Sequence, residues 1–257
     1  MTNVPPSPTE WLEVELADHV FSLRLNRPEA LNALRPEMLS GLASLIDQAS
    51  AREDVSVIVL EGAGRAFSAG VDLKVLQGID PAAGKIGDVF DAPAREVRVA
   101  IRAAAVPVIA KVHGACFTGA LEIALHCDFI FATRDAKFGD THTKFGLRPT
   151  WGMSQTLAQA VGVRRAKELS FTGRTFRGEE AVVLGLVNEA VEDREALDAR
   201  VAECAAAIAA NSRAAVGAMK VLYGLAQEER GIDAALEAEL DREFPEIQDT
   251  VERLAKF

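Results

Sequence analysis

The chain has 257 residues, of which 49% are hydrophobic, and its 38 acidic and 28 basic side chains give a net charge of −10. This balance is typical of a globular protein with one sizeable core, and the acidic surface argues against nucleic-acid binding, which needs clustered basic residues. The three cysteines form no paired motif, so we expect no disulfide framework and a reducing, cytoplasmic location.

The first residues, 1–10, are polar and rich in proline, with no basic start and no apolar run. We therefore expect a disordered tail rather than a signal peptide, followed by a single domain over 11–257. The most apolar stretch, 97–125, is interrupted by four charged residues, which argues against a membrane span.

The first half of the domain alternates between strand and helix patterns. Two β-rich runs, 11–16 and 20–26, predict an opening hairpin around residues 17–19. Apolar residues at helical spacing predict a helix over 36–50, behind a proline that suits a first turn. Further along the chain, the pattern predicts buried strands at 55–60, 106–112 and 129–132, and a helix from about 95 to 105.

Between two of these strands, residues 78–93 are rich in glycine and proline and predict a long irregular segment of the kind that often covers a ligand. Beyond Trp151 the pattern is mainly helical, with predicted helices at 153–161, 163–171, 178–184, 192–210, 212–227 and 231–241. The fold class is therefore α/β, with an α/β core to about residue 190 and a helical C-terminal region over 191–257.

Three familiar site patterns fail on inspection. Gly62-Ala63-Gly64 follows a strand, but the third glycine of a dinucleotide-binding fingerprint would fall at Phe67. Ser68 lies in the segment AFSAG, which has Ala66 where the first glycine of a nucleophile elbow would be. His113, Cys116, His126, Cys127 and His142 could be arranged as a zinc site, but their spacing matches no established pattern, so we expect core packing and no bound metal.

Four segments carry a resemblance to a known family. They are Leu25-Asn26-Arg27-Pro28-Glu29-Ala30-Leu31-Asn32-Ala33-Leu34, the segment 65–74 (RAFSAGVDLK), the segment 113–128 (HGACFTGALEIALHCD), and Phe138-Gly139 followed by Gly146-Leu147 and Pro149. In this order and over residues 11–240, they resemble the crotonase superfamily of enoyl-CoA hydratases and isomerases. The resemblance implies a crotonase-like spiral of ββα units. The alternative is that these glycines only serve tight turns in an unrelated α/β protein.

The resemblance implies an oxyanion hole formed by the backbone N–H groups of Val71 and Gly119. These groups would point at the carbonyl oxygen of an acyl-CoA thioester and stabilise its enolate. Donors that are fixed before the reaction need no reorganisation as charge develops. A pocket built from 67–74 and 113–128 is thus expected to hold the thioester.

Glu122 is the expected general acid/base. It lies in an apolar segment, where burial of a carboxyl group is costly unless the group is paired or functional, and where desolvation raises its pKa towards the useful range. In hydratases of the family, a second glutamate lies twenty residues later, and this chain has His142 there. Histidine exchanges protons near neutral pH, so His142 is either a second catalytic residue or a pocket wall that shapes substrate choice.

By the same resemblance, the residues expected to contact the CoA substrate are Ala30, Ala69, Val71, Asp72, Leu73, Lys74 and Gly119. Asp72 has the alternative role of a helix cap, and Lys74 that of a solvated helix lysine. CoA is part of the substrate, and we expect no separate cofactor. The family also implies a homotrimer or a dimer of trimers.

Hydration of a 2-trans-enoyl-CoA is therefore the leading expected reaction. Double-bond isomerisation is the nearest alternative, because it needs one base and no bound water. A non-catalytic acyl-CoA carrier and a thioester hydrolase are the other two, although Glu122 argues against the carrier.

Overall fold

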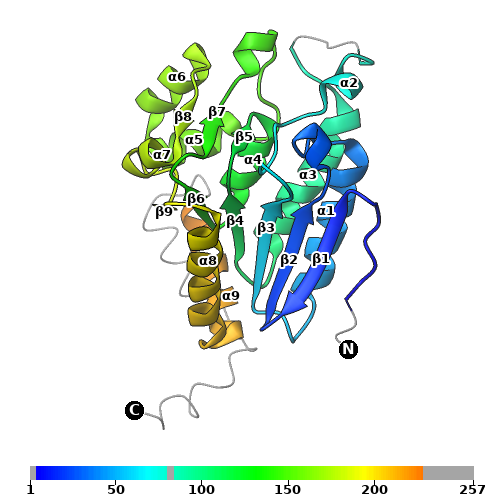
Figure 1. Cartoon of the computed structure of the whole chain (residues 1–257), viewed down its shortest axis with the longest axis vertical. Coiled ribbons are helices and arrows are strands. Elements are labelled where there is room, and N and C mark those ends of the chain that lie inside the picture. Colours follow the sequence, from blue (N-terminus) through cyan, green and yellow to red (C-terminus); the bar gives the residue numbers. More distant parts are fainter. Residues whose placement is uncertain (1–3, 80–83, 228–257) are drawn as a thin grey trace.

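A six-stranded sheet forms the main layer of the computed structural model, which describes residues 4–79 and 84–227 (Figure 1). Its strands, in spatial order, are β1 (Leu12–Ala17), β2 (Val20–Leu25), β3 (Val57–Gly62), β4 (Val108–Val112), β6 (Phe129–Thr133) and β9 (Glu189–Val191). The β1–β2 pair is antiparallel and every other neighbouring pair is parallel. The predicted α/β class is confirmed.

The predicted opening hairpin is also confirmed, with Leu12 opposite Leu25 and Ala17 opposite Val20. Asp18 and His19 form its two-residue turn, and both have positive φ angles, of 49° and 64°. A turn with two left-handed residues matches the right-handed twist of the strands that it joins.

Helices cover both faces of the sheet, which explains why every residue of β3 is buried. Ile58 and Leu60 pack on the side of α1 (Pro36–Ser50) and α3 (Asp88–Ala103), whereas Val57 and Val59 pack against α8 (Arg194–Ala209). Strands buried on both faces read as continuous apolar runs. The run at 55–60 therefore predicted the strand correctly, with an offset of two residues.

The segment 78–93 differs from the prediction in its second half. We expected irregular chain to residue 93 and a helix from about 95, but α3 begins at Asp88, directly after Gly87 with a φ angle of 79°. Pro93 lies inside the helix, where it removes a backbone donor. Burial of Phe90, Ala94 and Val97 at helical spacing against α1 offsets this cost.

A second sheet of three short strands lies beside the carboxyl ends of the main strands and was not predicted. Its order is β5 (Ala115–Phe117), β7 (Lys137–Gly139) and β8 (Phe176–Arg177). The later helices follow the prediction closely and are α5 (Met153–Val161), α6 (Val163–Thr172), α7 (Gly178–Leu184), α8 and α9 (Arg213–Gln227). The helix predicted at 231–241 lies outside the described residues.

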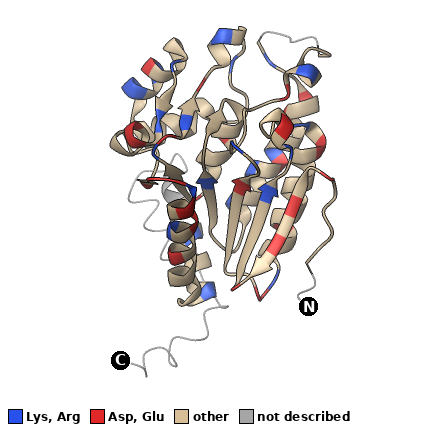
Figure 2. Cartoon of the chain, viewed as in Figure 1, with Lys and Arg blue, Asp and Glu red and all other residues tan. Residues whose placement is uncertain are grey.

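Basic and acidic residues are interspersed along the helices and strands drawn in Figure 2. In this view neither sign of charge takes over a whole element, and the chain as a whole carries an excess of acidic residues. Over 4–79 and 84–227, every helix is too short or too polar to cross a bilayer.

Candidate active site

Two segments singled out by the sequence lie side by side beyond the ends of β3 and β4. The N–H of Phe67 donates to the carbonyl of His113 over 2.7 Å, and the N–H of Ser68 donates to the carbonyl of Ala115 over 2.9 Å. Phe117 completes the ladder by donating its N–H to the carbonyl of Ser68. The start of the segment 67–74 is therefore fixed against the chain around β5 by backbone hydrogen bonds.

Asn32, in the opening motif, fixes the approach to this ladder. Its side-chain amide donates to the carbonyls of Ala63 and Ala66, both over 2.8 Å, and its side-chain oxygen accepts from the N–H of Arg27. Asn32 is fully buried with all these groups paired, so the first motif holds the second in position.

A cavity of about 490 Å³ lies beside these segments. All nine residues that the sequence proposed for the site line it, namely Ala30, Ala69, Val71, Asp72, Leu73, Lys74, Gly119, Glu122 and His142. Residues that were not named as site residues also line it, among them Phe117, Thr118, Thr141, Thr150 and Trp151. The cavity thus combines an apolar lining with a few polar groups, as ligand sites usually do.

Val71 and Gly119 both have backbone N–H groups without a hydrogen-bond acceptor among the described residues. Gly119 is the first residue of α4 (Gly119–His126), where an N–H group has no acceptor in its own helix. The preceding residue, Thr118, has φ 51° and ψ −113°, an unfavourable conformation for a residue with a side chain. Its N–H donates to the carbonyl of Gly139 and its hydroxyl bonds that of Thr141, so the strained turn is held in place.

Glycine at position 119 allows close packing with an aromatic ring. A methyl group added there would lie 2.6 Å from Cζ3 of Trp151, well inside van der Waals contact. Only a residue without a side chain therefore fits between the start of α4 and the indole ring.

Glu122 lies on the first turn of α4 and is 1% exposed. One carboxyl oxygen, Oε1, accepts from the N–H of Trp151 over 3.1 Å and from that of Met153 over 3.0 Å. Burial raises the pKa of Glu122 to about 7, against the opposing effects of His142 and the two N–H donors. The carboxyl group is thus poised to gain or lose a proton at neutral pH.

His142 begins the short helix η2 (His142–Phe145), directly beyond β7. Its Nδ1 lies 2.7 Å from Oδ1 of Asp140, a residue that is itself buried. Burial opposes ionisation of Asp140, but hydrogen bonds from His142 and Ser170 hold its pKa below the ordinary value. Asp140 was not predicted, because nothing in its sequence context distinguishes it from a turn residue.

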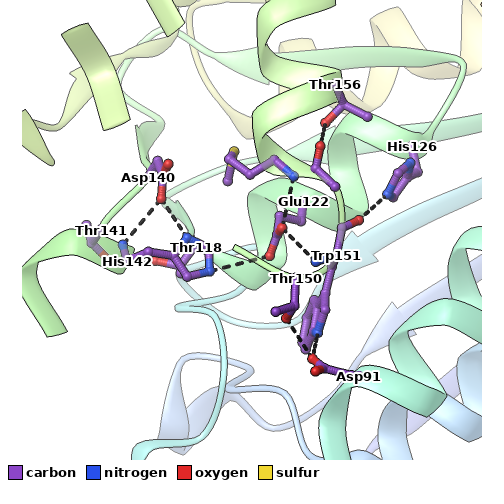
Figure 3. Close-up of polar contacts among 12 residues, drawn as sticks. Asp91, Thr118, Glu122, His126, Asp140, Thr141, His142, Thr150, Trp151 and Thr156 are labelled. Carbon is purple, nitrogen blue, oxygen red and sulfur yellow. Dashed lines mark hydrogen bonds and ion pairs between the residues drawn. The ribbon is translucent and has the colours of Figure 1, made fainter. Parts of the chain in front are cut away.

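The free oxygen of Glu122 faces the imidazole, as Figure 3 shows. Nε2 of His142 and Oε2 of Glu122 are 3.6 Å apart, which is too long for a direct hydrogen bond. A water molecule could bond both atoms across this gap. The arrangement offers two proton-exchanging groups on one wall of the cavity.

Trp151 and Asp91 are further site residues that the sequence did not reveal. Oδ1 of Asp91, on α3, accepts from Nε1 of Trp151 over 3.0 Å and from the hydroxyl of Thr150 over 2.7 Å. His126 donates from Nε2 to the carbonyl of Trp151 over 2.7 Å. The peptide that holds Glu122 is therefore fixed by groups from α3 and α4 (Figure 3).

Asp72 acts as the cap of the short helix α2 (Leu73–Leu76), with Oδ1 accepting from the N–H of Lys74 over 2.9 Å. Its other oxygen pairs with Arg27. Burial opposes ionisation of Asp72, but these partners keep its pKa below the ordinary value. Lys74, by contrast, is exposed and is among the residues that line the cavity.

The five residues considered for zinc serve separate purposes. Cys116 is fully buried in the core, and His113 donates from Nε2 to the carbonyl of Gly64. Over the described ranges, no three histidine, cysteine or acidic side chains gather in a way that could hold a metal ion.

Comparison with known proteins agrees with this architecture. The family model described as enoyl-CoA hydratase/isomerase matches residues 15–253. A probable peroxisomal enoyl-CoA hydratase from Arabidopsis thaliana is 37% identical over 194 residues, which cover 76% of this chain and 71% of the plant protein. A peroxisomal Delta(3,5)-Delta(2,4)-dienoyl-CoA isomerase from the same plant is 33% identical, covering 83% of this chain and 81% of that protein.

Among solved structures, an enoyl-CoA hydratase/carnithine racemase from Magnetospirillum magneticum superposes with a TM-score of 0.87. It is 31% identical, and the match covers 96% of this chain and 92% of that one. The matching family model, the similar sequences and the shared fold all indicate the same family. The chain belongs to the enoyl-CoA hydratase/isomerase family.

Proposed function

We propose that the protein hydrates a 2-trans-enoyl-CoA, adding water across the C2–C3 double bond. Glu122 would act as general acid/base, and the enolate of the thioester would be stabilised by the N–H groups of Val71 and Gly119. The observation that carries the proposal is Glu122 itself, a carboxyl group with a pKa of about 7 on the wall of a cavity that Val71 and Gly119 also line. The N–H groups of these two residues have no acceptor among the described residues.

The oxyanion role rests on the two N–H groups. As water adds to C3, negative charge moves onto the thioester oxygen, and an N–H group with no acceptor in the described part of the chain can bind it. Removing one such donor in other enzymes costs about 3 to 4 kcal/mol of transition-state stabilisation.

The proton transfers balance within the pair of side chains. The oxygen of the water bonds to C3 while Glu122 takes one of the water's protons. The carbanion at C2 then takes a proton from the imidazolium form of His142. The proton on Glu122 then passes to Nε2 through a water that bonds both atoms, which lie 3.6 Å apart, and both groups return to their starting states. Oε1 of Glu122 is held by two backbone N–H groups and fixes the position of the carboxyl group, while Oε2 would exchange the protons.

Isomerisation of the double bond is the second candidate. It is favoured by the imidazole where family hydratases have a second glutamate, since neutral imidazole has only one acceptor nitrogen with which to orient a water. A relative that is named as a dienoyl-CoA isomerase supports it as well. In this reaction Glu122 would move one proton between two carbons.

One assay separates the candidates. Purified protein is mixed with crotonyl-CoA and, separately, with a 3-enoyl-CoA, while the absorbance of the conjugated enoyl thioester and the free thiol are followed. Hydration removes the absorbance of crotonyl-CoA without thiol release, whereas isomerisation makes that absorbance appear from the 3-enoyl substrate. Thiol release would indicate hydrolysis, and binding without change would indicate a carrier; either result contradicts the proposal.

We further propose that the enzyme works without a cofactor besides the CoA of its substrate, in the cytoplasm, and as a homotrimer or a dimer of trimers. Lys74 and its neighbours Ala69 and Leu73 would contact the CoA moiety, together with Ala30. Sedimentation analysis of the purified chain distinguishes the two assemblies from a monomer.

A further inference from the structure

We propose that Asp140 is a positioning residue that holds His142 in one tautomer, with the proton on Nδ1, so that Nε2 faces Glu122 and can exchange a proton with it. The inference rests on the proposed function and deepens it, because it assigns the catalytic competence of His142 to a residue outside the cavity lining.

The hydrogen bond fixes where the imidazole proton lies. Asp140 is buried and its pKa is held low, so its carboxylate is ionised and can only accept hydrogen bonds. Oδ1 of Asp140 lies 2.7 Å from Nδ1 of His142, which must therefore be the protonated nitrogen. The same oxygen accepts from the backbone N–H of His142 over 3.3 Å, which fixes the ring relative to its own main chain.

The consequence appears on the other side of the ring. With Nδ1 protonated, neutral His142 has its lone pair on Nε2, 3.6 Å from Oε2 of Glu122. In the opposite tautomer, Nε2 would carry a hydrogen and could not accept the proton that Glu122 has taken from water. The carboxylate of Asp140 also stabilises the imidazolium that forms once Nε2 is protonated.

The local fold supports this function. Asp140 follows β7, and the turn that leads to His142 is tied to α4 by the hydroxyl pair of Thr118 and Thr141, 2.5 Å apart. Ser170 also bonds Asp140. The carboxylate is thus fixed from several directions, as a residue that orients a catalytic group should be.

The tautomer is measured directly by proton–nitrogen correlation NMR of the imidazole rings at a pH where His142 is neutral. The chain has only 4 histidines, and the spectrum of His142→Gln assigns the signals of position 142. We expect Nδ1 to be protonated in the wild type, and we expect Asp140→Asn to mix or reverse the tautomers, because its amide can also donate. A wild-type ring protonated at Nε2 would overturn the proposal without reference to activity.

Steady-state kinetics provide a second test of the role of Asp140. Asp140→Asn should lower kcat at least about tenfold while KM changes less than about threefold. In a His142→Gln background, the same substitution should cost less than about threefold, because a positioning residue has no effect once the group that it positions is gone. Asp135→Asn, which removes an exposed carboxylate from the same stretch of chain, is the matched control and should leave both constants unchanged.

The outcomes separate this inference from the proposed function. An equal loss of kcat in both backgrounds would assign Asp140 a merely structural role, and an altered tautomer with unchanged kcat would overturn its part in catalysis. If the wild type hydrates no enoyl-CoA, the proposed function fails, while the NMR result still decides whether Asp140 sets the tautomer. If Asp140→Asn does not fold, the wild-type spectrum alone remains able to contradict the proposal.

Discussion

Glu122 and His142 face each other with 3.6 Å between Oε2 and Nε2, and each is anchored on its opposite side. Two backbone N–H groups hold the carboxyl group through Oε1, and a buried carboxylate holds the imidazole through Nδ1. The two reactive atoms are therefore fixed relative to each other by contacts that use neither of them. This geometry leads to three predictions, and the packing at the start of α4 leads to a fourth.

The first concerns turnover. Glu122→Gln keeps the acceptor for the N–H groups of Trp151 and Met153 but removes the proton-exchanging group. We expect kcat to fall at least about a hundredfold, with little change in the affinity for acyl-CoA. Steady-state kinetics and calorimetric titration with a saturated acyl-CoA measure the two quantities. Near-normal turnover would exclude Glu122 as the acid/base.

The second prediction concerns the stability of the fold and is tested with the same variant, Glu122→Gln. The pKa of Glu122 is raised from 4.5 to about 7 by burial, so the folded protein holds this proton more tightly than the unfolded chain. The free energy of unfolding of the wild type therefore falls as the pH rises between these values, by about 3 kcal/mol in total.

Because glutamine does not ionise, Glu122→Gln should unfold at a higher temperature than the wild type at pH values above the raised pKa. The difference should vanish below the ordinary pKa of glutamate, where both side chains are neutral. Thermal unfolding across the pH range measures this. A variant that is less stable at high pH would show that the carboxylate is better paired than its surroundings indicate.

The third concerns the pH dependence of the rate. Hydration needs the carboxylate form of Glu122, so the acid limb of the kcat/KM profile should rise with pH, with a midpoint near the pKa of about 7. Because the mechanism also needs the imidazolium of His142 as proton donor, kcat/KM should fall again at higher pH. His142 lowers the pKa of Glu122 by its charge. In His142→Gln the midpoint should therefore move to higher pH, by about half a unit or more. An unchanged midpoint would mean that the two groups are not coupled, and unaltered turnover would make His142 a pocket wall.

The fourth concerns the start of α4. Gly119→Ala would bring a methyl group within 2.6 Å of the Trp151 ring, so the backbone or the ring must shift. We expect kcat to fall about a hundredfold or more, because the N–H of residue 119 would move from its position. Gly224→Ala is the matched control, since a methyl group there meets no atom of the described residues within 4 Å. Equal, small effects of the two variants would argue against an oxyanion role for Gly119.

Local patterns predicted the regular elements of this fold well. The hairpin, α1 and the buried strands each have a clear pattern of apolar residues. The predicted bounds of β3 and β4 differ from the observed ones by two residues, at the ends of the strands. The start of α3 was missed because its glycines and Pro93 indicate irregular chain, whereas burial against α1 makes a helix of it. The small second sheet was missed because strands of two or three residues have no period to detect.

The candidate site divides in the same way. Residues in contiguous motifs, such as Val71 and Gly119, could be named from the sequence because the motif fixes their mutual position. Asp91, Asp140 and Trp151 act through contacts made by the folded chain, and in the sequence each stands in a context typical of a helix surface or a turn. Their roles follow only from three-dimensional distances.

The most direct test of enoyl-CoA hydration is mass analysis of the product that the wild-type protein forms from crotonyl-CoA in water labelled with heavy oxygen. We predict a 3-hydroxyacyl-CoA that contains one labelled oxygen, and no such product from Glu122→Gln on the same time scale. Recovery of an unlabelled enoyl-CoA isomer, or of free CoA with the label in the acid, would contradict hydration at this site.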